Sequence, residues 1–362
     1  MRASCENRFE PDYAIHPGEI LEETLAARGI KKAELAERCQ ISTKHLSQII
    51  NGKAPVTADT AIQLERALGV SANIWNNLES QYRLFQARQQ ERERLSQGQE
   101  WLKRFPVAEL AKRGYIESSS DYIETLKNLL QFLGVSSTEA FERQSSRVAV
   151  LYRRAAAYES STESIAAWLR IGELEAESIE TDPYDVQVFR RNLSTIRALT
   201  REDPQSFEPK MKELCRNAGV ALVFARELPK TRLSGATRWL SSQKALIMLS
   251  LRYRWDDHFW FTFFHESAHI LLHPKKKIFI EETRSVSEPL EDEANEFAAN
   301  FLVPEGEYLT LARGVGLSRP RIESFAAGQG VAASVVVGRL QHDKVIGFNT
   351  YNDLRRRFQL DE

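Results

Sequence analysis

The segment His265-Glu266-Ser267-Ala268-His269 constrains this chain more than any other feature. In an α-helix, residues four positions apart lie on one face, about one turn apart, so both imidazoles could bind the same metal ion. The glutamate beside the first histidine would then point toward the open coordination position, where a general base is needed. The pattern therefore predicts a zinc site with its own base, Glu266.

The surroundings of the motif favour a single buried helix. Residues 259–264 and 270–272 are almost entirely aromatic or aliphatic, and His273-Pro274 provides an end signal. Two histidines and a glutamate are costly to bury without partners, so a metal site is preferred over a pair of structural histidines. We expect His258 to lie outside the helix. His273 lies a further turn along the axis, too far to join the same ion easily.

A catalytic zinc ion usually takes three protein ligands. A second helix is predicted to begin near Pro289, about twenty residues after the histidine pair, with an acidic first turn. Glu291 faces the same side as the small Ala294, which would allow close approach of the two helices, so Glu291 is the preferred third ligand. Glu293 remains the alternative, because spacing alone does not resolve the acidic run.

Several segments accompany the motif, and they are quoted as they stand in the chain: Glu291-x-x-Ala294-Asn295-x-Phe297-Ala298, Leu302-Val303-Pro304, Phe261-Thr262-Phe263-Phe264, Gly235 and Arg238-Trp239. Together with His265-Glu266-x-x-His269 they resemble the ImmA/IrrE family of metallopeptidases. The resemblance implies that His265, His269 and Glu291 bind Zn²⁺ and that Glu266 is the base. The family often carries glycine before its second histidine, where this chain has Ala268.

Further groups are needed around such a site. Carboxylates or carbonyls should orient the histidines, and Asn295 is our hypothesis for one such role. A donor should also stabilise the oxyanion that forms during amide hydrolysis. Arg238, Tyr253 and His258 are the candidates, and the sequence does not choose among them.

The N-terminal segment predicts a series of short helices, over residues 18–28, 32–39, 43–50 and 57–68. Two short helices joined by a tight turn, followed by supporting helices, form the helix-turn-helix layout. The second helix of the pair would present groups able to reach base edges or phosphates, and Lys53 would contact the DNA backbone near its end. The candidate DNA-contacting residues are Thr43, Lys44, His45, Ser47, Gln48 and Lys53. A small protein-interaction bundle is the alternative.

Several short segments here carry a second resemblance: His16-Pro17-Gly18-Glu19-Ile20-Leu21, Ile41-Ser42, Asn51-Gly52-Lys53, Thr57-Ala58-Asp59-Thr60-Ala61 and Trp75-x-x-Leu78. They resemble the Xre-type helix-turn-helix of HigA antitoxins. Such proteins generally bind palindromic operators as dimers. The resemblance therefore implies double-stranded operator DNA and a second copy of the chain, as a homodimer, among the partners.

Composition fits a regulator of more than one domain. The 362 residues are 42% hydrophobic, enough for more than one core. Three scattered cysteines indicate a reducing compartment, and neither a signal peptide nor a membrane-spanning segment is apparent, so we expect a cytoplasmic protein with no membrane partner. The 49 basic and 50 acidic residues leave a net charge of −1. DNA binding must therefore come from a local patch.

The predicted fold is mainly α with a small β-sheet, of the α+β class. A five-helix helix-turn-helix domain is expected over residues 1–85, a helical linker and helical domain over 86–200, a zincin-like metallopeptidase domain over 201–310, and a C-terminal helical region over 311–362. Residues 219–224 and 245–249 have the apolar character of strands. The run Arg355-Arg356-Arg357 is interpreted as a solvated helix end.

Two functions of different classes follow. The first is a DNA-binding regulator with a zinc-dependent endopeptidase that cleaves a specific protein, such as a repressor or a toxin–antitoxin partner. The second is a HigA-like antitoxin or repressor whose zinc-protease fold is a non-catalytic sensor of a ligand or partner. The complete set of His265, Glu266 and His269 favours the first, because a sensor has no need for the base.

Overall fold

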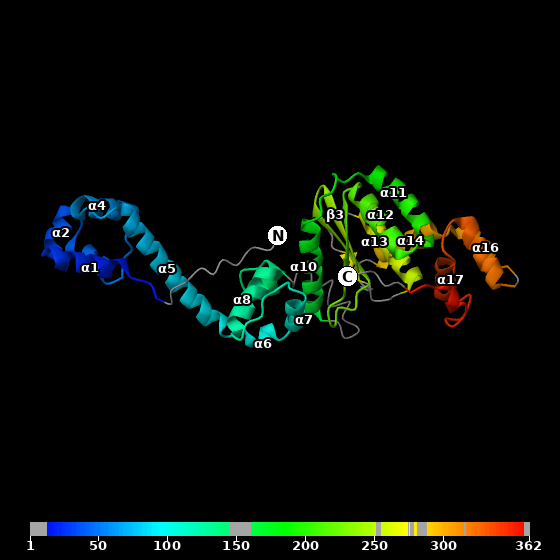
Figure 1. Ribbon diagram of the computed structural model, residues 1–362, viewed down its shortest axis with the longest axis horizontal. Coiled ribbons are helices and arrows are strands. Elements are labelled where there is room, and N and C mark those ends of the chain that lie inside the picture. The colour runs from blue at the N-terminus through cyan, green and yellow to red at the C-terminus, as the bar shows by residue number, and fades with distance from the viewer. Residues whose placement is uncertain are drawn as a thin grey trace. The chain divides into compact units, whose positions relative to one another are not determined.

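The computed structural model describes residues 13–144, 161–250, 255–273, 275, 279–280, 288–314 and 316–357 (Figure 1). The chain divides into two compact units, residues 1–98 and 99–362, and each is described by itself. The first predicted boundary, at residue 85, falls inside a helix that continues to Leu95. The predicted division into four segments, 1–85, 86–200, 201–310 and 311–362, stays a prediction, because the two compact units do not test it.

Unit 1 is a bundle of five helices: α1 (Pro17–Arg28), α2 (Lys32–Arg38), α3 (Thr43–Ile50), α4 (Ala58–Leu68) and α5 (Ala72–Leu95). The hydroxyl of Ser42 caps α3 by accepting a hydrogen bond from the His45 amide at 3.0 Å. Gly29 and Gly69 end α1 and α4 in the left-handed conformation that glycine adopts without steric cost. The core is fully buried, and its members include Leu21, Leu35, Leu46, Leu64 and Trp75.

Unit 2 contains the remaining elements. Its first helices are α6 (Gln99–Leu102), α7 (Val107–Lys112), α8 (Tyr122–Leu133), α10 (Thr162–Glu177), α11 (Val186–Ala198) and α12 (Pro204–Arg216), with a 3-10 turn at Leu199–Arg201. Its later helices are α13 (Asp256–Leu272), α14 (Glu288–Leu302), α15 (Glu305–Ala312), α16 (Arg319–Gln329) and α17 (Ala333–His342), with a 3-10 turn at Asn352–Leu354. The prediction of a mainly α protein with a small sheet is confirmed. Among the described residues, no helix is both long and apolar enough to cross a bilayer.

The sheet of unit 2 has the order β1-β3-β2-β4. Strand β1 (Val220–Ala225) pairs parallel with β3 (Lys244–Ser250), and β2 (Gly235–Ser241) pairs antiparallel with both β3 and β4 (Phe279–Ile280). The two predicted strands correspond to β1 and β3. Strand β2 was not predicted, because its residues entered only through the family resemblance and, for Arg238, as a candidate for oxyanion stabilisation.

Helices cover both faces of the sheet (Figure 1). Helix α10 packs on one face, where the indole of Trp168 donates a hydrogen bond to the Ala225 carbonyl at 2.9 Å. A Cβ at Gly172 would lie only 2.0 Å from the Met248 sulfur, so glycine lets α10 approach β3 closely. The opposite face, which includes Ile247, packs in one core with residues from α11, α12 and α13.

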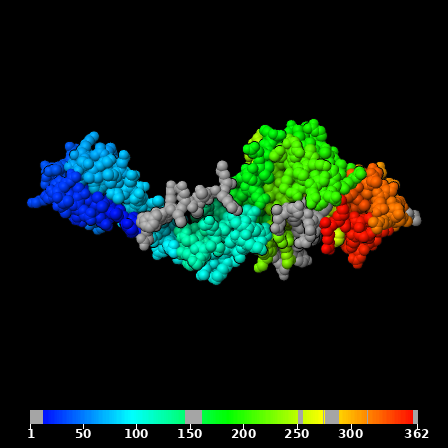
Figure 2. All heavy atoms as spheres, in the orientation of Figure 1, coloured from blue at the N-terminus to red at the C-terminus, as the bar shows by residue number. Residues whose placement is uncertain are grey.

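Helix α13 is the central helix of that core. Its Phe259, Trp260, Phe263 and Phe264 are all buried. The helix begins at Asp256, so the expectation that His258 lies outside it was wrong. The reason is that the two aspartates before His258 favour a helix N-terminus and extend the helix upstream of the apolar run. Helices α14 and α17 both pack against α13. The last two helices, α16 and α17, are coloured orange and red in Figure 2.

The arginine run near the C-terminus anchors the start of α13, so its interpretation as a solvated helix end was wrong. Asp256 is fully buried, and its carboxylate accepts hydrogen bonds from the Arg356 Nε and backbone N, both at 3.0 Å, and from the Ser334 hydroxyl at 2.6 Å. Arg355 pairs with Asp257 at 2.9 Å. Two buried or half-buried carboxylates thus explain why these cations turn inward.

We expect Arg356→Ala to lower the free energy of unfolding by about 2 to 3 kcal/mol, because it leaves a fully buried carboxylate without its cation. This value is below the range for wholly buried pairs, since the Arg356 side chain is 35% exposed. Arg357→Ala is the matched control, since Arg357 stacks on the Trp255 ring at 4.6 Å and contacts no buried carboxylate in the described part of the chain. Thermal unfolding followed by circular dichroism would measure both, and equal effects would contradict the anchoring role.

Candidate metal centre

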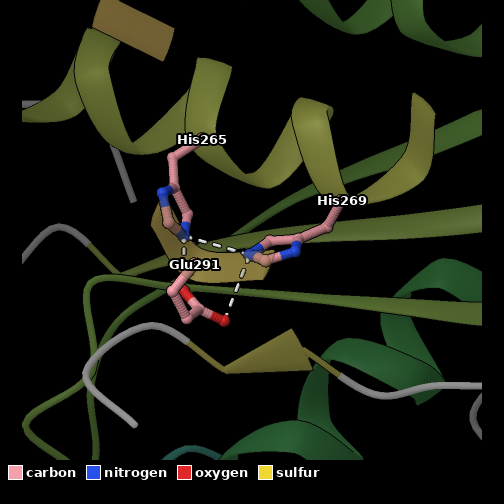
Figure 3. A group of neighbouring side chains, drawn as sticks. All are labelled: His265, His269 and Glu291. Carbon is pink, nitrogen blue, oxygen red and sulfur yellow. Dashed lines mark hydrogen bonds and ion pairs between the residues drawn. The ribbon is translucent and has the colours of Figure 1, made fainter. Parts of the chain in front are cut away.

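Two histidines of α13 and one glutamate of α14 converge on a point between the helices (Figure 3). The Nε2 atoms of His265 and His269 are 3.0 Å apart. The Glu291 carboxylate lies 3.2 Å from His265 Nε2 and 3.6 Å from His269 Nε2. The structure therefore brings together the three residues that the sequence analysis selected as ligands. Among the described residues, this is the group whose donor atoms could hold a metal ion.

The protonation states of this group suit a cation. Burial lowers the pKa of His269 to about 4 and so favours the neutral ring. Burial also opposes ionisation of Glu291, but its contacts with the rings of His265 and His269 outweigh burial and lower the pKa of Glu291 to about 2. A neutral imidazole and an ionised carboxylate are the forms in which these side chains bind metals.

Hydrogen bonds fix which nitrogen of His265 carries the proton. The Oδ1 atom of Asn295 lies 2.9 Å from His265 Nδ1, and an amide oxygen can only accept a hydrogen bond. His265 therefore donates from Nδ1, and its Nε2 lone pair points toward His269 and Glu291. Asn295 thus occupies the orienting position that the sequence analysis hypothesised for it.

The donor spacing fits a tetrahedral zinc ion. Ligands about 2.0 to 2.1 Å from zinc in a tetrahedral arrangement lie about 3.3 Å from one another. The two Nε2 atoms are 3.0 Å apart, Glu291 Oε2 lies 3.2 Å from His265 Nε2, and Glu291 Oε1 lies 3.6 Å from His269 Nε2. Two imidazole nitrogens and one carboxylate also form one of the ligand sets found in catalytic zinc sites. The residues present therefore fit the metal that the sequence predicts.

The candidate base, Glu266, is held by strand β2. Its side chain is fully buried, and its Oε2 accepts a hydrogen bond from the Thr237 hydroxyl at 2.5 Å. A Cβ at Gly235 would lie 2.7 Å from Glu266 Oε1, so only glycine leaves room for this carboxylate. Thr237 was not predicted as part of the site. Thr237 and Gly235 are two positions apart and so lie on the same face of a strand. This spacing would have indicated Thr237 if β2 had been predicted.

The three candidates for oxyanion stabilisation differ in their placement. Arg238 pairs with Glu173 of α10, on the sheet face opposite α13, which does not suit that role. His258 lies two turns before His265 on α13, with its Nε2 3.0 Å from the Ser234 hydroxyl. Tyr253 lies outside the described residues.

A cavity of about 680 Å³ lies beside the candidate metal centre. It follows the groove between α13 and α14, from Asn295 and Phe261 to Val335 and Gly338 of α17. The three candidate ligands do not line this cavity, which comes nearest to the centre at Phe261, one helical turn before His265, and at Asn295.

In unit 1, the candidate DNA-contacting residues lie on or just after α3. Thr43, Lys44 and Lys53 are exposed, whereas His45, Ser47 and Gln48 are half-buried. Leu46 and Ile49 on the other side of the helix are fully buried and hold it in the bundle. This is the arrangement in which a second helix presents its N-terminal residues to a groove.

Comparison with known proteins identifies both units. Residues 21–75 match the family model described as helix-turn-helix, and residues 221–340 match the one described as IrrE N-terminal-like domain, of the M78 peptidase type. The chain therefore belongs to the helix-turn-helix family, and carries an IrrE/ImmA-like peptidase domain in its second unit. Both expectations of resemblance are confirmed.

The relatives match unit 1. Virulence-associated protein I of Dichelobacter nodosus is 40% identical over 77 residues, which are 21% of this chain and 71% of that protein. The uncharacterized HTH-type transcriptional regulator YddM of Escherichia coli is 32% identical over 71 residues, 20% of this chain and 76% of that protein. A solved structure of Pseudomonas aeruginosa antitoxin HigA with the higBA promoter is 39% identical, covering 21% of this chain and 83% of that one, with a TM-score of 0.20.

We expect the purified wild-type chain to hold about one zinc ion, and His265→Ala, His269→Ala and Glu291→Ala each to lose most of it, because each removes one of three donors. Elemental analysis after dialysis against metal-free buffer would measure this. Glu296→Gln is the control, an exposed carboxylate on the same helix as Glu291. Full zinc occupancy in Glu291→Ala would rule out Glu291 as a ligand.

Proposed function

We propose that this protein is a DNA-binding transcriptional regulator whose second unit is a zinc-dependent endopeptidase. Its substrate would be a specific regulatory protein, such as a repressor or a toxin–antitoxin partner. We also propose a cytoplasmic location, because a regulator that binds DNA must reach its operator. The carrying observation is the convergence of the buried His265 and His269 with the half-buried Glu291, beside a buried Glu266.

The arrangement supports amide hydrolysis by metal-activated water. A zinc ion held by these ligands would lower the pKa of water and polarise a carbonyl group. The Glu266 carboxylate takes a proton from the attacking water and can pass it to the leaving amine. Thr237 and Gly235 hold the carboxylate in place for both transfers, through the hydroxyl contact and the space left by a missing Cβ.

The base argues for catalysis over sensing. A non-catalytic sensor could use the histidine pair and Glu291, but it has no use for a carboxylate buried at the adjacent position. Burying an ionisable group is costly, and Glu266 is fully buried. The hydrogen bond from Thr237 to the Glu266 carboxylate supports a functional reason for burying this group.

Glu266→Gln should abolish cleavage and retain zinc, because the amide keeps the size of the side chain but cannot accept a proton. Loss of a general base typically lowers the rate by a factor of about 10² to 10⁴. Quantitative profiling of new protein N-termini would compare cells that produce the wild type with cells that produce the variant. Identical profiles under several stresses, with zinc bound in both proteins, would favour the sensor function.

For unit 1, we propose that α3 enters the major groove of a palindromic operator and that the chain binds as a homodimer. The name of the Escherichia coli relative, an HTH-type transcriptional regulator, supports the regulatory role. The exposed Thr43 and Lys44 at the start of α3 support the choice of reading helix. Lys53, exposed just beyond its end, is suited to a phosphate contact.

Lys53→Ala should weaken binding to all DNA sequences similarly and reduce the salt dependence of binding by roughly one phosphate contact, whereas Gln48→Ala should change sequence preference. The operator would first be selected from a random duplex library with the full-length Glu266→Gln protein. Fluorescence anisotropy at several salt concentrations would then measure the variants. Lys103→Ala, exposed in unit 2, is the control. An unchanged salt dependence in Lys53→Ala would contradict the phosphate contact.

A further inference from the structure

A third histidine and a second carboxylate continue the candidate metal centre outward. His273 Nδ1 lies 2.8 Å from His269 Nδ1, and His273 Nε2 lies 3.2 Å from Glu293 Oε2. His273 is buried, whereas the Glu293 side chain is 52% exposed. From the sequence, His273 has no predicted function and Glu293 is the alternative third metal ligand. Here Glu293 contacts His273, while Glu291 contacts the histidine pair.

These contacts define a direction of hydrogen bonding. An ionised carboxylate can only accept, so His273 donates from Nε2 to Glu293. With its proton on Nε2, the His273 ring offers the Nδ1 lone pair as an acceptor, and His269 donates to it from its own Nδ1. That leaves the lone pair of His269 on Nε2, which is the atom that faces His265 and Glu291.

Both histidines of the pair are therefore set in the same tautomer from outside. Asn295 holds His265, and the His273–Glu293 pair holds His269. The two Nε2 atoms then meet at 3.0 Å as two acceptors, next to a carboxylate. Three acceptors this close repel one another, and a cation between them relieves the repulsion. The outer contacts thus prepare the centre for a metal before one binds.

We propose that His273 and Glu293 act as positioning residues that orient the metal ligand His269 and raise its affinity for Zn²⁺. This inference rests on the proposed zinc site and adds to it a carboxylate–histidine pair behind one ligand. Groups behind a metal-binding histidine typically change metal affinity by a factor of about 10 to 100 when they are removed. Glu293 lies near the surface and closes the hydrogen-bond chain there.

Two competing roles give different expectations. If His273 only fills space in the core, a residue of similar size should replace it. If Glu293 is itself a metal ligand, its removal should cost as much affinity as removal of Glu291. The positioning role predicts that a residue of similar size without an acceptor at the Nδ1 position does not restore Zn²⁺ affinity. It also predicts that removing Glu293 lowers Zn²⁺ affinity less than removing Glu291.

The test is the dissociation constant of Zn²⁺ from the purified full-length chain, measured by competition with a chromophoric chelator. His273→Phe keeps the ring volume and removes the acceptor, so we expect affinity about 10- to 100-fold weaker. His273→Asn loses volume but keeps an oxygen close to the Nδ1 position, and should recover part of that loss. Glu293→Gln keeps an acceptor without the charge and should weaken binding less than His273→Phe.

Matched controls separate these effects from general damage. His342→Phe changes a histidine that is 86% exposed, and Glu305→Gln changes an exposed carboxylate of α15, so both should bind Zn²⁺ like the wild type. Thermal unfolding of the metal-free proteins shows whether each variant folds. Selective ¹⁵N labelling of histidine adds a signature, because the nitrogen resonances of His269 report which ring atom carries the proton.

Wild-type affinity in His273→Phe would overturn the proposal, as would weaker binding in His273→Asn than in His273→Phe. Affinity lost in Glu293→Gln as fully as in Glu291→Ala would instead identify Glu293 as a ligand and also overturn it. These outcomes are independent of the peptidase proposal. A chain that binds Zn²⁺ as described but cleaves nothing would refute the proposed activity and leave the positioning role intact.

Discussion

The convergence of two histidine rings and a carboxylate between α13 and α14 is the constraint on which the candidate metal centre depends. His265 and His269 are buried and Glu291 is half-buried, and each pair of these residues approaches to between 3.0 and 3.6 Å. Desolvated polar atoms require partners, and a cation between three acceptors would relieve their mutual repulsion. The neighbouring elements provide these partners. Strand β2 contacts Glu266 through Thr237, and α14 carries Glu291 and Asn295.

Apolar side chains of unit 2 pack around the three converging residues and supply the hydrophobic burial that polar residues do not. Aromatic residues of α13 fill the space toward the sheet, and α17 packs along the same helix. The rigidity of this core keeps the donors at fixed separations, which a metal site needs and a mobile loop could not provide. The regulatory unit is a separate core of its own, built around Trp75 and the short helices before it.

Much of the centre was predictable because the helical repeat converts sequence spacing into geometry. The spacing of His265 and His269 placed both rings on one face, and Ala294 identified the side of α14 that approaches, so Glu291 could be preferred over Glu293. The caps at Ser42 and Gly69 likewise marked helix ends correctly. These features depend on local chemistry, which sequence contains directly.

Features that depend on distant partners were not predictable in the same way. Thr237 contacts Glu266 across 29 positions of sequence, and Arg356 contacts Asp256 across 100. A run of three arginines has no local property that distinguishes a solvated end from an anchor. His273 could be excluded as a ligand from its distance along the helix, but its position behind His269 requires knowledge of where Glu293 lies.

The anchor at Asp256 also has a consequence for biosynthesis. The buried carboxylate at the start of α13 has to wait for an arginine that follows 100 positions later in the chain. At translation rates of about 5 to 20 residues per second, the ribosome needs roughly 5 to 20 s to deliver that arginine. During this interval the N-terminal helices can already have folded, since their core is formed within residues 13–98. The nascent protein would therefore be able to recognise DNA before its peptidase helix is secured.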